Sequence, residues 1–145
     1  MTVDLPDLAS MEAFGVRIAA RLRLGDIVAL TGNLGTGKTT LARAIIAALG
    51  HKGEVPSPTF TIVETYDGLD PPLVHADFYR LESPREAGEL GLDDYREGAA
   101  LLAEWPDRAG GFAHEAACLS VTLEFAESGR KAIVKGGEDW LGRLP

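Results

Sequence analysis

Apolar residues recur at intervals of three and four near the start of the chain, and this spacing predicts an amphipathic helix. Ser10 precedes the apolar stripe as a candidate N-cap, and Gly25 follows it. Residues 26–30 (DIVAL) form a short apolar run bounded by glycines, which is typical of a strand buried on both faces. A second helix is expected over residues 38–49, because Gly50 follows its last apolar position. The stripe of the first helix consists of Met11, Phe14, Ile18 and Leu22.

The second half of the chain contains several short extended runs separated by turn-forming residues. A helix is expected to begin near Ser83, with this serine as its N-cap and Pro84 in the first turn. Two late runs joined by a short turn predict a closing antiparallel hairpin. The whole pattern predicts a single α/β domain over residues 1–145, whose mainly parallel central sheet is flanked by helices. The extended runs are residues 60–66, 73–79 and 99–104, and the hairpin pair is 119–125 and 130–136.

Composition narrows the class of protein. The chain has 22 acidic and 14 basic residues and a net charge of −8, so stand-alone binding to nucleic acid is disfavoured because phosphate backbones are repelled. The single Cys118 excludes an internal disulfide and a multi-cysteine zinc cluster, and its apolar neighbours indicate a buried small hydrophobe. Neither a signal-peptide pattern nor a membrane-spanning run is found. A soluble, cytoplasmic protein without membrane contact is expected.

Residues 32–39 (GNLGTGKT) match the eight-position P-loop pattern and lie in the required context, after a predicted strand and at the start of a predicted helix. Glycines let successive N–H groups turn toward phosphate oxygens, and the helix adds the positive end of its dipole. Lys38 is expected to reach the β- and γ-phosphates, and the Thr39 hydroxyl to ligate Mg²⁺. The alternative is a glycine-rich turn that binds no ligand, but the Gly-Lys-Thr sequence, placed after a strand and at the start of a helix, disfavours it. The α/β domain is therefore predicted to have a P-loop NTPase-like fold. The candidate ATP-binding residues of this segment are Asn33, Leu34, Gly35, Thr36, Gly37, Lys38, Thr39 and Thr40.

Two carboxylates are candidates for the metal and the catalytic step. Asp77 and Glu104 each follow an apolar run, as expected of acids at the carboxyl edge of a parallel sheet. For either alone, a solvated strand-end carboxylate is the competing interpretation. His75 shares the strand face of Asp77, where it either orients a group or only packs. Thr59, on an extended loop after the P-loop helix, is a candidate switch-like threonine that senses the γ-phosphate, or a loop threonine that caps a turn.

Four segments in order, GNLGTGKTTLAR, SPTFTIVETY, HADFYRL and LLAEWPDRAG, closely resemble the TsaE (YjeE) family, small bacterial P-loop ATPases of tRNA threonylcarbamoyladenosine synthesis. The resemblance spans about residues 5–125. It implies that ATP and Mg²⁺ are the cofactors, and that the N-terminal segment around Asp7 contributes to adenine binding. By this resemblance, Lys38 and Thr39 bind phosphate and Mg²⁺, Asp77 is a catalytic acid, and Glu104 is the Walker-B-like metal residue. Trp105 lies beside the site, and Thr59 is the switch-like threonine.

The resemblance also implies a partner. TsaE family members support the TsaD–TsaB complex, which attaches the threonylcarbamoyl group to tRNA, so this chain would hydrolyse ATP without performing the transfer. Contact with tRNA would then be indirect, which fits the acidic composition. ATP hydrolysis by the isolated chain is expected to be slow and to be stimulated by the partners, because the sequence has no evident arginine finger of its own. Arg80, three residues after Asp77, is either such an arginine or a surface salt-bridge partner.

Three other classes of P-loop protein are alternatives. A regulatory GTPase is disfavoured, since residues 107–110 match Asp-x-x-Gly but no guanine-reading Asn-Lys-x-Asp motif occurs. A small-molecule kinase is the main alternative; it would need an arginine-rich lid, and the later arginines are scattered along the chain. A nucleotide-gated binding module would share the P-loop but need no catalytic acid. The later arginines are Arg80, Arg85, Arg96 and Arg108.

Overall fold

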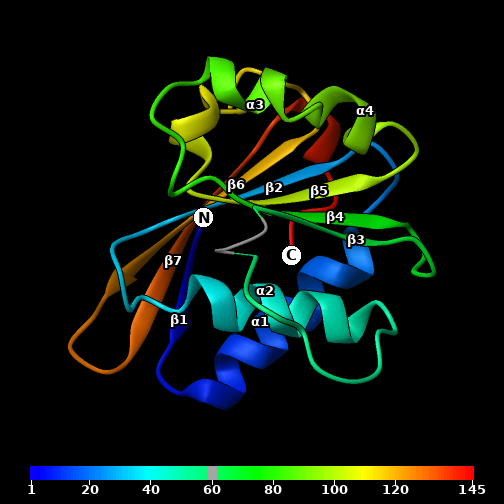
Figure 1. Ribbon diagram of the computed structural model, residues 1–145. Helices are drawn as coiled ribbons and strands as arrows, with labels where there is room; N and C mark the ends of the chain where they lie inside the picture. Colours follow the sequence, from blue (N-terminus) through cyan, green and yellow to red (C-terminus); the bar gives the residue numbers. More distant parts are fainter. Residues whose placement is uncertain (59–61) are drawn as a thin grey trace.

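We describe residues 1–58 and 62–145 of a computed structural model of the chain. Within these residues, one seven-stranded sheet carries helices on both faces (Figure 1). The strands are β1 (Thr2–Leu5), β2 (Ile27–Thr31), β3 (Val63–Tyr66), β4 (Leu73–Asp77), β5 (Ala100–Glu104), β6 (Cys118–Phe125) and β7 (Arg130–Gly136). The helices are α1 (Leu8–Arg21), α2 (Lys38–Ala48), α3 (Arg85–Glu89) and α4 (Leu92–Arg96), with 3₁₀ turns η1 (Pro106–Ala109) and η2 (Glu138–Trp140).

The strand order is β1-β7-β6-β2-β5-β4-β3, with β2 at the centre. β2 runs parallel to β5 on one side and to β6 on the other, and β4 extends the parallel set beyond β5. β7, β1 and β3 pair antiparallel with their neighbours. The predicted α/β class, its mainly parallel centre and the closing β6–β7 hairpin are therefore confirmed.

Strand β1 was not predicted from the sequence. It lies at one edge of the sheet and pairs with β7, so that Thr2 lies opposite Ile133. A four-residue run with an acidic member has little strand propensity of its own. Its conformation depends on a partner strand from the other end of the chain, which no local pattern reveals.

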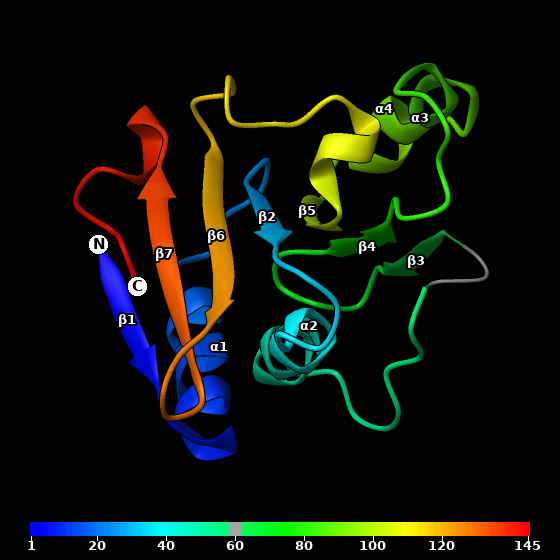
Figure 2. The ribbon, with the colours of Figure 1, turned by 90° about the vertical axis from the view of Figure 1, so that its left-hand side faces the viewer.

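The helices form two unequal layers (Figures 1 and 2). α1 and α2 lie side by side against one face, where they bury the larger apolar core. α3, α4 and η1 cover the other face over β4 and β5 and enclose a smaller core. β5 is buried at every position and β2 at all but its last, which explains the continuous apolar runs in the sequence.

The start of α1 differs from the prediction. Asp7, not Ser10, is the N-cap: its carboxylate accepts a hydrogen bond from the Ser10 N–H at 2.8 Å. The Asp7 N–H in turn donates to the Ser10 hydroxyl oxygen at 3.1 Å, which completes a capping box. These hydrogen bonds lower the pKa of Asp7. The predicted cap was wrong by one turn because either residue type can cap a helix, and only the backbone conformation decides between them.

The helix predicted from Ser83 is instead two short ones. Pro84 is the N-cap of α3, and the carboxylate of Glu86 accepts hydrogen bonds from the backbone N–H groups of Glu82 and Ser83. Gly91, with φ of +78°, separates α3 from α4. The Ser83 cap was wrong: the helix begins one residue later, after Pro84, and the Ser83 N–H is bound by the Glu86 carboxylate.

The C-terminal residues are fixed to the start of β2 by a buried ion pair. Both Arg143 terminal nitrogens donate to the Asp26 carboxylate at 2.7 Å, and one also donates to the Arg21 carbonyl. Asp26 further accepts the Arg23 N–H at 2.7 Å. The guanidinium lies 4.1 Å from the centroid of the buried Trp140 ring. The hydrogen bonds to Asp26 raise the pKa of Arg143 further above its ordinary value.

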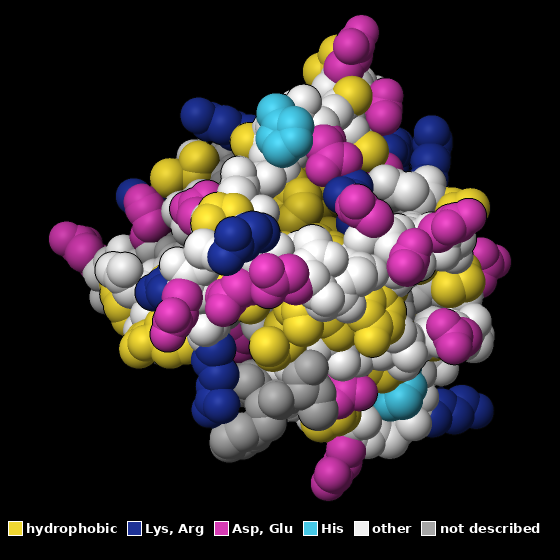
Figure 3. Space-filling view, turned by 45° about the horizontal axis from the view of Figure 1, so that its top comes forward, with side chains coloured by type: hydrophobic (Ala, Val, Ile, Leu, Met, Phe, Trp, Pro, Cys, Tyr) yellow, Lys and Arg dark blue, Asp and Glu magenta, His cyan; other side chains and the backbone are white. Residues whose placement is uncertain are grey.

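Acidic side chains are spread over the face that carries α3 and α4, and among the described residues in view there the basic ones do not gather into one patch (Figure 3). Cys118 is buried, as predicted, and burial raises the pKa of its thiol. Within the described ranges, no helix is long and apolar enough to cross a membrane.

Candidate functional site

The P-loop joins the carboxyl end of β2 to the start of α2. Gly37, the N-cap of α2, has φ of +104°, a conformation that favours glycine. A Cβ atom on Gly32 would lie 2.7 Å from the Leu123 carbonyl oxygen, so the loop and β6 approach each other closely. Gly37 has no side chain that could form a capping hydrogen bond at the start of α2. The loop and helix therefore have the geometry of an anion cradle at a helix N-terminus.

Lys38 is buried and its ammonium group lies within the loop. It donates hydrogen bonds to the carbonyl oxygens of Gly32, at 2.5 Å, and Asn33, at 3.1 Å. Burial lowers the pKa of Lys38, while the negative charges of Glu104 and Asp77 oppose that effect. The lysine is thus a buried cation within the P-loop, in a position to meet a further anion.

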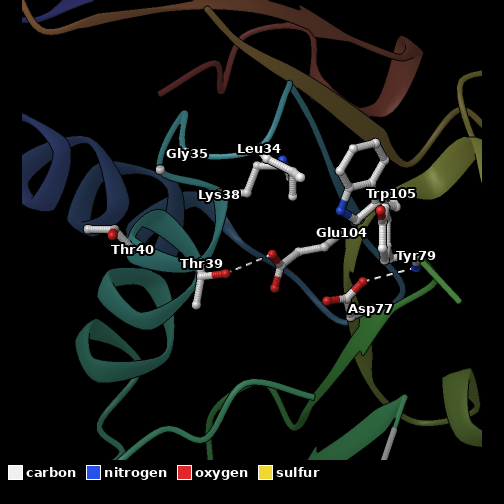
Figure 4. Close-up of a pocket in the computed structure, with 10 residues that line it drawn as sticks. Leu34, Gly35, Lys38, Thr39, Thr40, Asp77, Tyr79, Glu104 and Trp105 are labelled. Atoms are coloured by element: carbon white, nitrogen blue, oxygen red, sulfur yellow. Dashed lines mark hydrogen bonds between the residues drawn. The ribbon is translucent and has the colours of Figure 1, made fainter. Parts of the chain in front are cut away.

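The two predicted acids lie next to each other. Asp77 and Glu104 end the adjacent parallel strands β4 and β5 and are register partners. Both are buried, and Glu104 accepts a hydrogen bond from the Thr39 hydroxyl at 3.1 Å (Figure 4). Asp77 accepts the backbone N–H of Tyr79 at 3.0 Å. The sheet thus brings together three predicted residues from distant parts of the sequence.

The partner of His75 lies on the neighbouring strand. The ring shares the face of Asp77, yet its Nε2 lies 2.7 Å from a carboxylate oxygen of Glu104 on the next strand. His75 is fully buried. Of the two interpretations open from the sequence, orienting a group fits this contact better than packing alone.

Aromatic rings form one wall of the site. Trp105 follows β5 directly and has φ of +54°, a conformation that costs on the order of 1–3 kcal/mol for a bulky residue. The Lys38 ammonium lies 4.4 Å from the centroid of the Trp105 ring, and the Tyr79 ring lies 5.0 Å from it (Figure 4). Trp105 was expected beside the site, whereas Tyr79 was missed even though it lies within the HADFYRL segment.

Two adjoining cavities meet at the P-loop. The first, of about 410 Å³, contains the lysine, the threonine, both acids and the aromatic wall. The second, of about 300 Å³, lies between the loop, the N-terminal segment with Asp7, and the β6–β7 hairpin. Gly35, Gly37 and Thr40 line both. Arg130 of β7 lines the second cavity and donates to the Gly35 carbonyl at 3.0 Å, a contact between residues 95 positions apart that the sequence did not suggest.

This architecture is shared with known proteins. A sequence model of the family described as "Threonylcarbamoyl adenosine biosynthesis protein TsaE" matches residues 5–133. The chain belongs to the TsaE family. The TsaE protein of Haemophilus influenzae is 37% identical over 136 residues, which cover 90% of this chain and 85% of the relative. The TsaE protein of Streptomyces coelicolor is 45% identical over 98 residues, 66% of each chain. The crystal structure of Bacillus subtilis YdiB superimposes with a TM-score of 0.75 at 27% identity, over 97% of this chain and 87% of that one.

Most of the predicted site residues of this TsaE family member are collected by the fold. Apart from Asn33 and Thr59, each of them lines one of the two cavities. Asn33 contributes its carbonyl oxygen, which accepts hydrogen bonds from Lys38 and from the Thr36 hydroxyl. Thr59 lies outside the described residues, so its switch-like role stays a prediction.

The donor atoms of the first cavity fit Mg²⁺. Thr39, Glu104 and Asp77 offer hydroxyl and carboxylate oxygens, the hard ligands that this ion prefers. In the part of the chain that the structure describes, no cluster of three or more His, Cys, Asp or Glu side chains could enclose a metal. Such a sparse set suits an ion that takes its other ligands from water and substrate phosphates.

Proposed function

We propose that this TsaE family member binds ATP with Mg²⁺, hydrolyses it, and acts as an accessory protein in the threonylcarbamoyladenosine modification of tRNA. The observation that carries the proposal is the first cavity, where Lys38 and Thr39 of the P-loop face two buried carboxylates on adjacent strands. Its relatives in Haemophilus influenzae and Streptomyces coelicolor are named as tRNA threonylcarbamoyladenosine biosynthesis proteins, which supports the pathway.

The two cavities suggest how ATP is divided between them. The triphosphate would occupy the first, against the P-loop N–H groups and Lys38. The nucleoside would enter the second, between the loop and the N-terminal segment, where Leu5 and Met11 offer apolar surface and Asp7 a carboxylate. Thr40 lines both cavities, as expected of a residue beside the phosphate nearest the ribose.

The two carboxylates would have different tasks. Glu104, already hydrogen-bonded to Thr39, would hold the magnesium site with it. An Mg²⁺ ion held there would neutralise negative charge on the phosphates of ATP. Asp77 would orient the attacking water and accept its proton as the water oxygen bonds to the γ-phosphorus. The bond to the β,γ-bridging oxygen breaks, and ADP leaves with that electron pair. Labelled ATP tests this reaction: the γ-phosphate should pass to water and not to an acceptor, as a kinase would require.

Two of the four later arginines are held away from the first cavity, which weakens the kinase alternative because a kinase lid would need clustered arginines. Arg96 is paired with Glu115 at 2.6 Å, and its guanidinium lies 5.6 Å from the Phe112 ring centroid in the smaller core. Arg85 is paired with Glu89 one turn along α3, at 3.4 Å. Neither lines the first cavity.

Nucleotide binding should be visible in one of the two tryptophans. Trp105 lines the first cavity, whereas Trp140 is fully buried and donates its Nε1–H to the Ala117 carbonyl at 2.8 Å. Mg-ATP should therefore change the emission of wild-type protein and of Trp140→Phe, while Trp105→Phe should give no response. The reverse pattern in a fluorescence titration would place the nucleotide elsewhere.

We further propose that the TsaD–TsaB complex is the partner and that it accelerates hydrolysis. No arginine among the described residues lines the first cavity, and an arginine supplied in trans can increase phosphoryl-transfer rates by about 10³–10⁵. Single-turnover hydrolysis should be slow for the isolated chain and faster with the purified complex. A fast basal rate that the complex leaves unchanged would contradict this proposal.

A further inference from the structure

The carboxylate of Glu104 contacts two different residues, one through each oxygen. One oxygen, Oε1, accepts the Thr39 hydroxyl at 3.1 Å, and the other, Oε2, lies 2.7 Å from the His75 Nε2. The Glu104 side chain is 3% exposed and that of His75 is 0% exposed, so water does not compete for the contact between them. Each oxygen therefore has its own protein partner.

The direction of the hydrogen bond follows from the chemistry of the two groups. An ionised carboxylate only accepts hydrogen bonds, so the His75 Nε2 carries a proton and donates it to Oε2. The other ring nitrogen, Nδ1, is buried and has no hydrogen-bond partner among the described residues. The tautomer protonated at Nε2 alone avoids a buried, unpaired N–H group.

Strand register explains why His75 reaches this acid. His75 lies opposite Leu102, and Asp77 lies opposite Glu104, so His75 and Glu104 are diagonal neighbours on the face that packs against α2. Such diagonal positions are within reach of long and aromatic side chains. Asp77 is oriented separately, by the backbone N–H of Tyr79.

We propose that His75 is a positioning residue for the magnesium site, an inference that rests on the proposed function. By occupying Oε2 it fixes the Glu104 side chain so that Oε1 points toward Thr39 and the metal. Without this donor, Oε2 would be buried and unpaired, and the carboxylate would turn to satisfy it, away from the metal position. Partners that orient metal ligands in this way typically change metal affinity or activity by about 10–100-fold when they are removed.

The experiment compares two polar replacements of different length. In His75→Gln the side-chain amide can place an N–H group near the position of Nε2, whereas in His75→Asn the amide ends near the position of Nδ1 and cannot reach Glu104. Trp105 emission is titrated with Mg²⁺ at constant ATP, and binding of ATP is measured separately in EDTA. We expect His75→Asn to need about 10–100-fold more Mg²⁺ for half the response, with His75→Gln close to wild type. Binding of ATP in EDTA should be the same in all three proteins.

His51→Gln serves as the matched control, because His51 bonds the Glu54 carbonyl at 3.1 Å and does not line either cavity. Wild-type magnesium dependence in His75→Asn would overturn the inference. So would equal losses in the Asn and Gln variants, or a loss of ATP binding in EDTA, since either would indicate a purely structural role. A wild-type protein without any response to Mg-ATP would instead contradict the proposed function.

Discussion

Lys38→Ala should reduce ATP hydrolysis by at least about 10²-fold, the scale of loss when one preorganised electrostatic partner of a transition state is removed. The lysine is the only cationic side chain among the described residues that line the first cavity. An alanine at this position leaves the P-loop N–H groups in place but removes the point charge that would meet the β- and γ-phosphates. Steady-state turnover at saturating Mg-ATP measures the effect.

The same change should leave the thermal unfolding of the protein nearly normal. The two carbonyl groups that lose the Lys38 donor belong to Gly32, which is half-buried, and to Asn33, which is exposed, so water can replace the ammonium. Burial already lowers the pKa of Lys38, which means that the protein does not strongly stabilise its charge. Lys52→Ala, at an exposed position, is the control and should retain full activity. Unchanged turnover in Lys38→Ala would refute the assignment of the phosphate site.

Arg143→Met should show the opposite pattern, a large loss of stability with the site intact. Methionine keeps much of the packing volume but leaves the Asp26 carboxylate, whose side chain is only 3% exposed, without its charged partner. Removing one member of a buried ion pair typically costs about 3–5 kcal/mol. Urea unfolding followed by circular dichroism measures the loss. A change below about 1 kcal/mol would show that Asp26 finds adequate partners elsewhere.

Two further variants test whether the stability loss comes from the Asp26–Arg143 ion pair itself. Asp26→Asn combined with Arg143→Met removes both charges, so the double variant should lose less stability than the sum of the single ones. Arg85→Ala breaks an exposed pair with Glu89 and should have no measurable effect. Asp26 and the P-loop lie at opposite ends of β2. The fraction of Arg143→Met that is folded should therefore still respond to Mg-ATP.

The sequence predicted those parts of the site that local patterns encode. Glycine spacing located the P-loop, and the apolar runs before Asp77 and Glu104 placed both acids at the carboxyl edge of the sheet. The sequence could not predict contacts that depend on the order and register of the strands. The bond from His75 to Glu104 needs the register of β4 on β5, and the contact of Arg130 with the loop needs the position of the hairpin.

The prediction of the N-cap of α1 was wrong for a different reason. Asp7 and Ser10 are both residue types that cap helices, and the sequence carries no information on which of the two has extended backbone angles. In the structure, Asp7 does, with φ of −148°. Local ambiguity and long-range pairing are therefore separate limits on what the chain alone reveals.

The position of β7 has a consequence for the order in which the protein matures on the ribosome. The P-loop is synthesised well before Arg130, which bonds the Gly35 carbonyl from 95 positions later, and before the strand that pairs with β1. Domains fold as units when their chain is complete. The wall of the second cavity that the hairpin supplies is thus absent from a nascent chain that stops before residue 129. Such a fragment would carry an intact phosphate-binding motif and still lack one wall of the proposed nucleoside pocket, so it should retain nucleotide less well than a chain that includes the hairpin.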